Sequence, residues 1–305
     1  MSQSGAFVTA VLDWAADEGF GFSDVVSLGN KASEDETDFM RRWADDPETN
    51  VVMAYLESVV DGRAFIDTAR EATRETPVVA VKSGRTSAGA QAASSHTGAI
   101  AGSEAAYEAG LAQAGVLRAE TVEEFFDYAR ALDGLPVPET DAVAVVTNAG
   151  GPGVMTTDAV GDSDLSMASF ADDTRDALVE TLPGNANVHN PVDVIGDADV
   201  ERFEGALDTV LGDGDVGAAV VVAAPTAVID YGDLAASVVA CQREHGKPIV
   251  ACLMGGERVK EPVDTLEAAG IPNYFDPARA VSSLDAVALQ RTIEGREYEA
   301  PAEFD

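Results

Sequence analysis

One histidine lies within a run of small and hydroxyl residues, Ser94-Ser95-His96-Thr97-Gly98-Ala99-Ile100-Ala101-Gly102. The run follows an apolar segment, and loops after the strands of a parallel sheet are where α/β proteins bind ligands. Its small side chains would let a phosphate approach the imidazole, with Ser95, Thr97 and Gly98 as donors. Neutral imidazole is a competent nucleophile near pH 7. The pattern predicts a reactive histidine beside a phosphate; the alternative is a solvated surface histidine.

Glu57 is the candidate carboxylate partner of His96. It directly follows the apolar run 51–56, so we expect it at the same sheet edge as the loop before His96. A carboxylate on the second imidazole nitrogen would fix the tautomer and favour the developing cation. The alternative is a solvated glutamate at a strand end, in a chain with 54 acidic residues.

Two further segments have the composition of anion-binding helix N-termini. They are Ser2-Gln3-Ser4-Gly5 and Gly150-Gly151-Pro152-Gly153, each directly before or within the start of an expected helix. The first turn of a helix offers unpaired N–H groups and a partial positive charge, and glycine lets an anion approach closely. Both segments are therefore candidate phosphate sites, although such sequences also form plain tight turns or helix caps.

Short apolar runs alternate with amphipathic segments along the chain, which predicts parallel strands joined by crossover helices. Strands are predicted at 24–28, 51–56, 78–81, 142–146, 218–222 and 249–253. Helices are predicted at 7–18, 34–45, 63–74, 103–114, 122–132, 200–211, 234–244, 259–269 and 278–289, with one more that ends at 160. A loop of small residues is expected from 83 to 97.

Pro136, Pro138 and Thr140 interrupt the alternation, so we place the limits of two domains at 1–138 and 141–305. The second half repeats the layout of the first, which predicts two tandem doubly wound α/β domains. Such a domain usually opens with a buried strand before its first helix. Here Ser2–Gly5 directly precedes that helix, so either the first strand is missing or residues from elsewhere fill its place.

Acidic residues outnumber basic ones by 54 to 19, which gives a net charge of −35. Such a chain repels nucleic acid and anionic lipid, so neither is expected as a partner. The acid is spread along the chain and indicates adaptation to high salt, as in a halophilic, archaeal-type cytoplasm; the alternative is an ordinary acidic protein. No apolar run approaches the roughly 20 residues of a membrane span, and no signal peptide is recognised.

Several reaction classes lack their motifs here. The sequence has no Walker loop, HExxH motif, Cys/His zinc cluster or GxSxG elbow, so no metal site is predicted. Its glycine-rich loops lack GxGxxG spacing, which argues against NAD. The remaining histidines are interpreted structurally, His189 in an X-Pro turn and His245 at the end of a helix.

Seven short segments of the chain, taken in order, resemble the motifs of one known family. They are Ser2-Gln3-Ser4-Gly5-Ala6-Phe7, Ser27-Leu28-Gly29-Asn30-Lys31-Ala32, Leu56-Glu57-Ser58, Lys82-Ser83-Gly84-Arg85, Ser95-His96-Thr97-Gly98-Ala99-Ile100-Ala101-Gly102, Asn148-Ala149-Gly150-Gly151-Pro152-Gly153 and Asn190-Pro191-Val192-Asp193. Together they resemble the ligase domains of the NDP-forming (ADP-forming) acyl-CoA synthetases, which include acetyl-CoA synthetase and are related to succinyl-CoA synthetase. The resemblance covers nearly the whole chain and implies two flavodoxin-like domains.

This resemblance implies the reaction acyl-CoA + ADP + phosphate ⇌ carboxylic acid + CoA + ATP, through an acyl phosphate and a phosphohistidine. His96 matches the histidine and Glu57 the carboxylate that orients it. The N-termini at Ser2–Gly5 and Gly150–Gly153 match a pair that faces the phosphoryl group from both sides, so the two domains are expected to pack face to face. Contacts to CoA are expected near Gly29, Asn30 and Lys31.

The family also has a CoA-binding domain and an ATP-grasp nucleotide-binding domain, and neither is recognised here. These domains or subunits are therefore expected as partners, in a homo- or hetero-oligomer, with CoA thioester, phosphate and ADP or ATP with Mg as substrates and no permanently bound cofactor. The alternatives are a non-catalytic, ligand-sensing module or an inactive gene remnant. The presence of both His96 and Glu57 favours catalysis.

Overall fold

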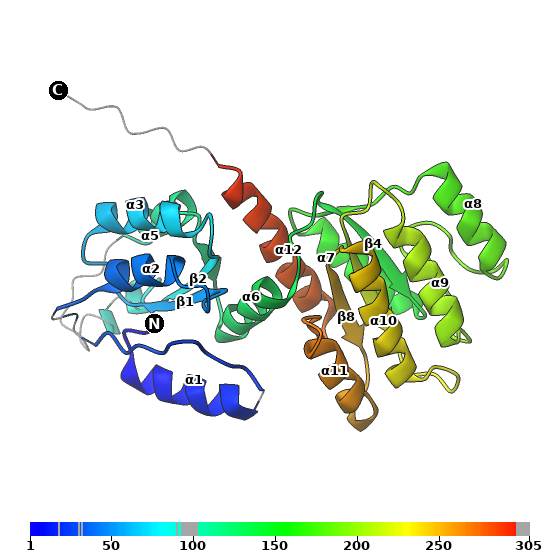
Figure 1. Cartoon of the computed structure of the whole chain (residues 1–305), viewed down its shortest axis with the longest axis horizontal. Helices are drawn as coiled ribbons and strands as arrows, with labels where there is room; N and C mark the ends of the chain where they lie inside the picture. The colour runs from blue at the N-terminus through cyan, green and yellow to red at the C-terminus, as the bar shows by residue number, and fades with distance from the viewer. Residues whose placement is uncertain (18, 30, 32, 90, 93–102, 297–305) are drawn as a thin grey trace. The chain divides into compact units, whose positions relative to one another are not determined.

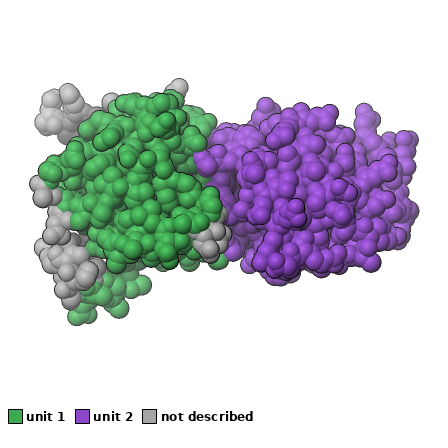
Figure 2. All heavy atoms as spheres, turned by 60° about the horizontal axis from the view of Figure 1, so that its bottom comes forward, with its two compact units in different colours: residues 1–129, 292–305 green, residues 130–291 purple. Residues whose placement is uncertain are grey.

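The computed structural model describes residues 1–17, 19–29, 31, 33–89, 91–92 and 103–296. The chain forms two compact units (Figures 1 and 2). Unit 1 comprises Met1–Ala129 with Thr292–Asp305, and unit 2 comprises Arg130–Arg291. The domain limits 1–138 and 141–305 stay a prediction. Among the described residues, no helix is both long and apolar enough to span a membrane.

Unit 1 contains a parallel sheet. Its strands are β1 (Val52–Leu56), β2 (Val78–Lys82) and β3 (Leu117–Ala119), in the order β1-β2-β3. Ser2 extends the sheet beyond β1 because it forms parallel bridges to Tyr55 and to Ser27. The position of Ser2 thus lies between Ser27 and β1, which gives the spatial order 2-1-3-4-5 of a flavodoxin-like sheet.

Met1–Gln3 fills the place of the first strand in unit 1. The N–H groups of Ser2 and Leu28 donate to Val26 O and Ser2 O at 2.9 and 2.8 Å. On the other side, Gln3 N donates to Tyr55 O at 3.1 Å and Tyr55 N to Met1 O at 3.0 Å. The predicted strand at 24–28 is reduced to the single bridge at Ser27.

Helices cover both faces of this sheet. They are α1 (Gly5–Asp17), α2 (Glu36–Ala44), α3 (Gly62–Ala72), α5 (Glu104–Gln113) and α6 (Val122–Gly134). Buried side chains of α2, α3 and α5, among them Met40 and Phe65, pack against Val52, Ala54 and Leu56 of β1. The alternate residue of β1, Tyr55, contacts Phe7 of α1 on the opposite face, with ring centroids 4.6 Å apart. Figure 1 shows α1 on the side of the sheet away from α2 and α3.

Unit 2 has the same kind of parallel sheet. Its strands are β4 (Ala142–Thr147), β5 (Ser166–Met167), β6 (Val192–Asp193), β7 (Ala218–Ala223) and β8 (Ile249–Leu253). The order is β5-β4-β7-β8, and β6 pairs with the carboxyl end of β4 on the same side as β5. A bridge from Ala251 to Asn273 adds one further position.

The side chain of Asn190 fills the gap between β5 and β6. Its Oδ1 accepts from Val145 N at 2.9 Å, and its Nδ2 donates to Val143 O at 2.7 Å and Ala168 O at 3.1 Å. The side chain therefore replaces the main-chain hydrogen bonds that a continuous strand would give β4. Sequence reasoning placed this asparagine in an X-Pro turn and in a family motif, and gave its side chain no role in the sheet.

Two helical layers enclose the sheet of unit 2. The helices are α7 (Gly150–Gly161), α8 (Asp172–Thr181), α9 (Val200–Leu211), α10 (Tyr231–His245), the 3-10 turn η1 (Glu257–Val259), α11 (Lys260–Glu267) and α12 (Pro277–Glu294). One buried cluster joins α8, α9, α10 and α11 to the sheet, and a second joins α7 and α12 to its other face. The prediction of doubly wound α/β units with parallel sheets is thereby confirmed.

The sequence reading missed three short strands and one helix. The strands β3, β5 and β6 and the helix α8 were not predicted. Residues 87–89 and 91–92 are helical, so the expectation of a loop throughout 83–97 is wrong in that stretch. Strands of two or three residues leave no visible period of apolar residues, so only pairing with a neighbouring strand identifies them.

Asp285 provides a test of how burial of acid limits stability. Burial raises the pKa of its carboxyl above the ordinary 3.8, a hydrogen bond from Asp164 N opposes this, and the charges of Asp164 and Asp141 raise the pKa further. Above the raised pKa, folding must bury an ionised carboxylate, which lowers the free energy of unfolding. This penalty fades as the pH falls toward 3.8, because the carboxyl of the folded chain is protonated before that of the unfolded chain. Asp285→Asn should therefore raise Tm at pH 7, with a gain that shrinks on acidification. A gain that is independent of pH, or none, would contradict this, with the exposed Asp264→Asn as control.

Gly153 tests the packing of α7 on β4. A Cβ atom at this position would lie 2.9 Å from Thr147 Cγ2, whereas a Cβ at Gly151 would have nothing within 4 Å. Gly153→Ala should therefore lower the free energy of unfolding by about 1–3 kcal/mol. Gly151→Ala, the matched control in the same helix, should stay within about 1 kcal/mol of the original protein. Urea unfolding of both variants measures the difference; equal stabilities would refute the packing argument.

Candidate active site

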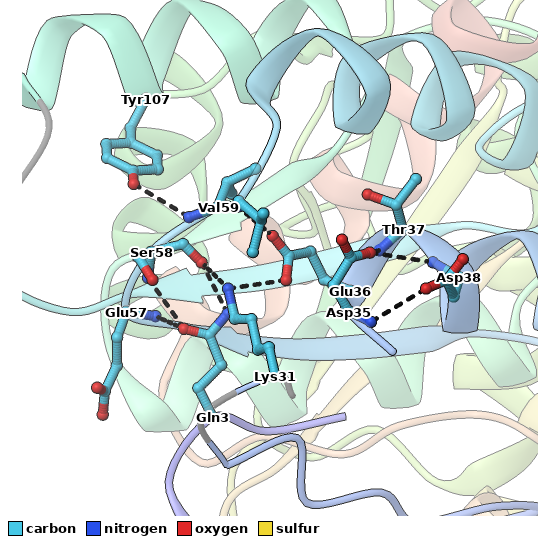
Figure 3. A network of polar contacts seen from close by, with 11 residues as sticks. Gln3, Lys31, Asp35, Glu36, Thr37, Asp38, Glu57, Ser58, Val59 and Tyr107 are labelled. Atoms are coloured by element: carbon cyan, nitrogen blue, oxygen red, sulfur yellow. Dashed lines mark hydrogen bonds and ion pairs between the residues drawn. The ribbon is translucent and has the colours of Figure 1, made fainter. Parts of the chain in front are cut away.

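Gln3 joins the start of α1 to the segment that carries Glu57 (Figure 3). Its Oε1 accepts from Glu57 N at 2.8 Å and from Ser58 N at 2.9 Å. Its Nε2 donates to Ser58 O at 2.8 Å. The structure thus brings together two segments that the sequence singled out separately. The amide of Gln3, which we expected to bind phosphate, is instead engaged by main chain.

Three more side chains hold the main chain after β1. Lys31 Nζ donates to Ser58 O at 2.6 Å and forms an ion pair with Glu36 Oε2 at 2.8 Å. The other oxygen of Glu36 accepts from Val60 N at 2.9 Å. Tyr107 Oη accepts from Val59 N at 3.2 Å. Figure 3 shows these groups arranged around residues 57–60.

The carboxylate of Glu57 points away from this network in Figure 3. Glu57 is partly buried and lies at the carboxyl edge of the sheet, one residue after Leu56. The pairing of β1 with β2 ends next to Glu57, where Ser83 N donates to Leu56 O at 3.0 Å. The side chain of Glu57 is therefore presented by a well-held main chain at the edge where α/β folds bind ligands.

Lys82 is a buried cation at the same edge, paired in register with Leu56. Its ammonium donates to Ser83 O and lies 4.5 Å from the ring centroid of Tyr107. Burial lowers the pKa of Lys82 from its ordinary 10.5, while the charges of Glu104 and Glu57 raise it and that of Arg118 lowers it further. Sequence reasoning quoted this lysine in a motif without giving it a role; its rarity, as one of four lysines, was the available signal.

The first turn of α1 offers main-chain donors. Ser4 caps the helix, since its Oγ accepts from Phe7 N at 3.3 Å. Ser2 Oγ accepts from Ser4 N at 3.0 Å and donates to Ser4 O at 2.9 Å. Within the described part of the chain, the N–H groups of Gly5 and Ala6 have no partner. Two amides at the positive end of a helix can bind an anion.

The first turn of α7 in unit 2 is built differently. Its N-cap residue, Ala149, has no side-chain oxygen for capping, and Gly153 N donates to Ala149 O at 3.1 Å. The exposed Gly150 and Gly151 stand at the helix N-terminus. A Cβ atom on Gly150 would be 3.4 Å from Asp193 Oδ2, so this end of the helix has a carboxylate beside it. The sequence reading had not placed that carboxylate.

The remaining predicted site residues have different outcomes. Lys31 has a left-handed backbone with φ 54°, and its ammonium is committed to Glu36 and Ser58 O inside unit 1. Gly29, with φ 53°, lies in the same turn. The predicted residues Asn30, Ser95, His96, Thr97 and Gly98 lie outside the described residues. Contacts of 29–31 with CoA stay a prediction.

A closed ring of four charges was also missed by sequence reasoning. Arg85 and Arg118 each pair with both Glu104 and Glu120, with Arg85 Nε 3.8 Å from Glu104 Oε1 and Arg118 Nε 3.1 Å from Glu120 Oε1. Arg85 follows β2, and Glu120 follows β3. The ring thus lies at the carboxyl edge of the sheet, beside Lys82, and balances its own charge.

Two family models match the chain, one for each of its two α/β units. Residues 1–132 match the family described as succinyl-CoA ligase like flavodoxin domain. Residues 143–289 match the family described as ligase-CoA domain. The matches follow one another along the chain.

Relatives with assigned activities cover nearly the whole chain. Acetate–CoA ligase [ADP-forming] I of Archaeoglobus fulgidus is 45% identical over 97% of this chain and 42% of its own length. The alpha subunit of acetate–CoA ligase [ADP-forming] I of Pyrococcus furiosus is 41% identical over 94% of this chain and 62% of its own length. The chain therefore spans about two fifths to three fifths of these relatives.

A solved structure agrees with both. Acetyl-coenzyme A synthetase 1 of Ca. Korarchaeum cryptofilum, in complex with phosphate and ADP, matches with a TM-score of 0.91 and 36% identity, over 96% of this chain and 64% of that one. Sequence and fold thus point to one family across both units. The chain thus matches a succinyl-CoA ligase like flavodoxin domain followed by a ligase-CoA domain, and over nearly its whole length it is similar to part of the ADP-forming acetate–CoA ligases.

Proposed function

We propose that this chain is the ligase core of an ADP-forming acetyl-CoA synthetase that works through a phosphohistidine at His96. The overall reaction is acetyl-CoA + ADP + phosphate ⇌ acetate + CoA + ATP. A phosphate oxygen attacks the thioester carbonyl, CoA leaves as the thiolate, and acetyl phosphate forms. An imidazole nitrogen of His96 then attacks phosphorus and acetate leaves. ADP finally takes the phosphoryl group from the histidine, which regenerates the imidazole.

The observation that carries this proposal is the attachment of Gln3 to the main chain of Glu57 and Ser58. This attachment holds the main chain of Glu57 at a fixed position relative to the start of α1, where the amides of Gly5 and Ala6 are free. The carboxylate would hold the N–H of the imidazole and so leave the other nitrogen free to attack. The helix amides would stabilise charge on the phosphoryl oxygens. These are the two kinds of group that a phosphohistidine centre requires.

Unit 2 is included in the proposal through α7. The glycines at its N-terminus, Gly150, Gly151 and Gly153, give it the same small-residue surface as the start of α1. We propose that these residues, with Ser2, Gln3, Ser4 and Gly5 and the loop residues Ser95, Thr97 and Gly98, belong to the phosphate-binding machinery. For Gln3 the contribution is indirect, since its side chain binds main chain.

Partners are part of the proposal because the chain spans only part of its relatives. One relative is named as an alpha subunit, at 41% identity. We propose that domains or subunits which bind CoA and the Mg–nucleotide complete the enzyme, in the cytoplasm. The two family matches and the joint presence of His96 and Glu57 favour this function over a ligand-sensing module.

Replacement of His96 tests the chemistry directly. The chain should take up label from ³²P-acetyl phosphate at high salt, in a form that is labile to acid and stable to base. His96→Asn should reduce that label to background, because no nucleophile remains, while circular dichroism stays unchanged. Label that persists in the variant would sink the role of His96, and an unlabelled original chain would count against phosphorylation by this chain alone.

Replacement of Glu57 tests its orienting role. The substitution Glu57→Gln leaves in place the main-chain N–H that Gln3 binds, so the variant should fold normally. It should slow phosphorylation by about 100-fold, because the imidazole loses its fixed tautomer and the charge that favours the cation. Glu75→Gln, an exposed glutamate that precedes β2, is the matched control. Single-turnover labelling measures both, and equal rates would remove Glu57 from the mechanism.

A further inference from the structure

Every main-chain N–H from residue 57 to residue 60 donates to a side chain. The acceptors for Glu57 and Ser58 belong to Gln3, that for Val59 to Tyr107, and that for Val60 to Glu36. The carbonyl of Ser58 in addition accepts from both Gln3 and Lys31. Beyond the end of a strand such groups are usually bound by water or by turns. Here they are bound by side chains from four other parts of unit 1.

The central members of this set are Lys31 and Glu36, an ion pair removed from solvent. Their side chains are 7% and 0% exposed, and their charged atoms lie 2.8 Å apart. Both ends of the pair reach the segment after β1, Lys31 at Ser58 O and Glu36 at Val60 N. A buried ion pair contributes little to stability compared with apolar residues of the same size. Its geometry, however, holds two points of the main chain on either side of Val59.

We infer that the Lys31–Glu36 pair is a positioning device for Glu57. The pair acts on Glu57 through its contacts with Ser58 O and Val60 N. This inference rests on the proposed function, in which the Glu57 carboxylate orients His96. It assigns Lys31 a role inside unit 1, while the contact of residues 29–31 with CoA stays a separate prediction. A displacement of about 1 Å at a catalytic group costs a large factor in rate, so the support of Glu57 matters for turnover.

The decisive variant replaces both charges with neutral side chains of similar size. Lys31→Met and Glu36→Gln singly leave one buried charge without its partner, so both should lower Tm. The double variant Lys31→Met/Glu36→Gln removes both charges and keeps an acceptor for Val60 N, so Tm should recover. Its phosphorylation rate per folded molecule should stay about 10-fold low, since Ser58 O has lost its ammonium donor. A purely structural role predicts that rate and Tm recover together.

Lys247 supplies the matched control. Its ammonium donates to Leu211 O and Asp213 O, both at 2.7 Å, in unit 2, so it is likewise a lysine that holds main-chain carbonyls. Lys247→Met should lower Tm and leave the labelling rate per folded molecule within about twofold of the original. A fall in rate equal to that of the double variant would show that any lost lysine has this effect and would overturn the inference.

Hydrogen exchange at residues 57–60 gives a readout that does not depend on activity. The four amides should be protected in the original chain and should exchange at least about 10-fold faster in the double variant, with β1 and β2 unchanged. Unchanged protection, or a fully recovered labelling rate, would overturn the inference. If the original chain takes no label, phosphorylation by this chain alone fails, and the exchange rates then decide by themselves whether the pair fixes this segment.

Discussion

The main chain beyond β1 has no strand to pair with, yet its polar groups must be bound for Glu57 to keep one position. Unit 1 meets this requirement with the side chains of Gln3, Lys31, Glu36 and Tyr107. The segment is only partly buried, but each of its N–H or C=O groups that is withdrawn from water needs a partner, because an unpaired one is costly. The start of α1, the turn at Lys31 and the N-terminus of α2 are thereby tied to the main chain that carries the Glu57 carboxylate.

Positive charge is scarce throughout the chain. It has only four lysines in a molecule of net charge −35. Lys31, Lys82 and Lys247 all donate to main-chain carbonyls, and Lys260 pairs with an exposed glutamate. The ammonium groups of the lysines are thus already engaged, and few of them are left to bind an anionic substrate. Helix N-termini supply positive potential without side-chain charge, which suits a strongly acidic protein.

The two units complete one sheet topology in different ways. In each unit, the second strand of the topology, which lies beside the first, is short or interrupted. It is a single bridge at Ser27 in unit 1 and the two short strands β5 and β6 in unit 2. In unit 2 the side chain of Asn190 substitutes for missing main-chain partners. In unit 1, Met1–Gln3 performs the task of a first strand with hydrogen bonds on both sides. Side-chain amides thus complete main-chain pairing in both units, through Gln3 and Asn190.

The sequence by itself determined the alternation of the longer strands and helices, the parallel class of the sheets and the resemblance to the ADP-forming acyl-CoA synthetases, because apolar periods and short motifs can be read from the chain alone. It also singled out Glu57 and the start of α1 as separate candidates. Only the tertiary structure showed that Gln3 joins them, that Lys31 is committed to Glu36 and Ser58, and that Tyr107 holds Val59. These contacts span long stretches of sequence: 27 positions separate Lys31 from Ser58, 48 separate Tyr107 from Val59, and 55 separate Gln3 from Ser58. No local pattern records such pairings, because folding alone decides which distant side chain reaches an unpaired main-chain group.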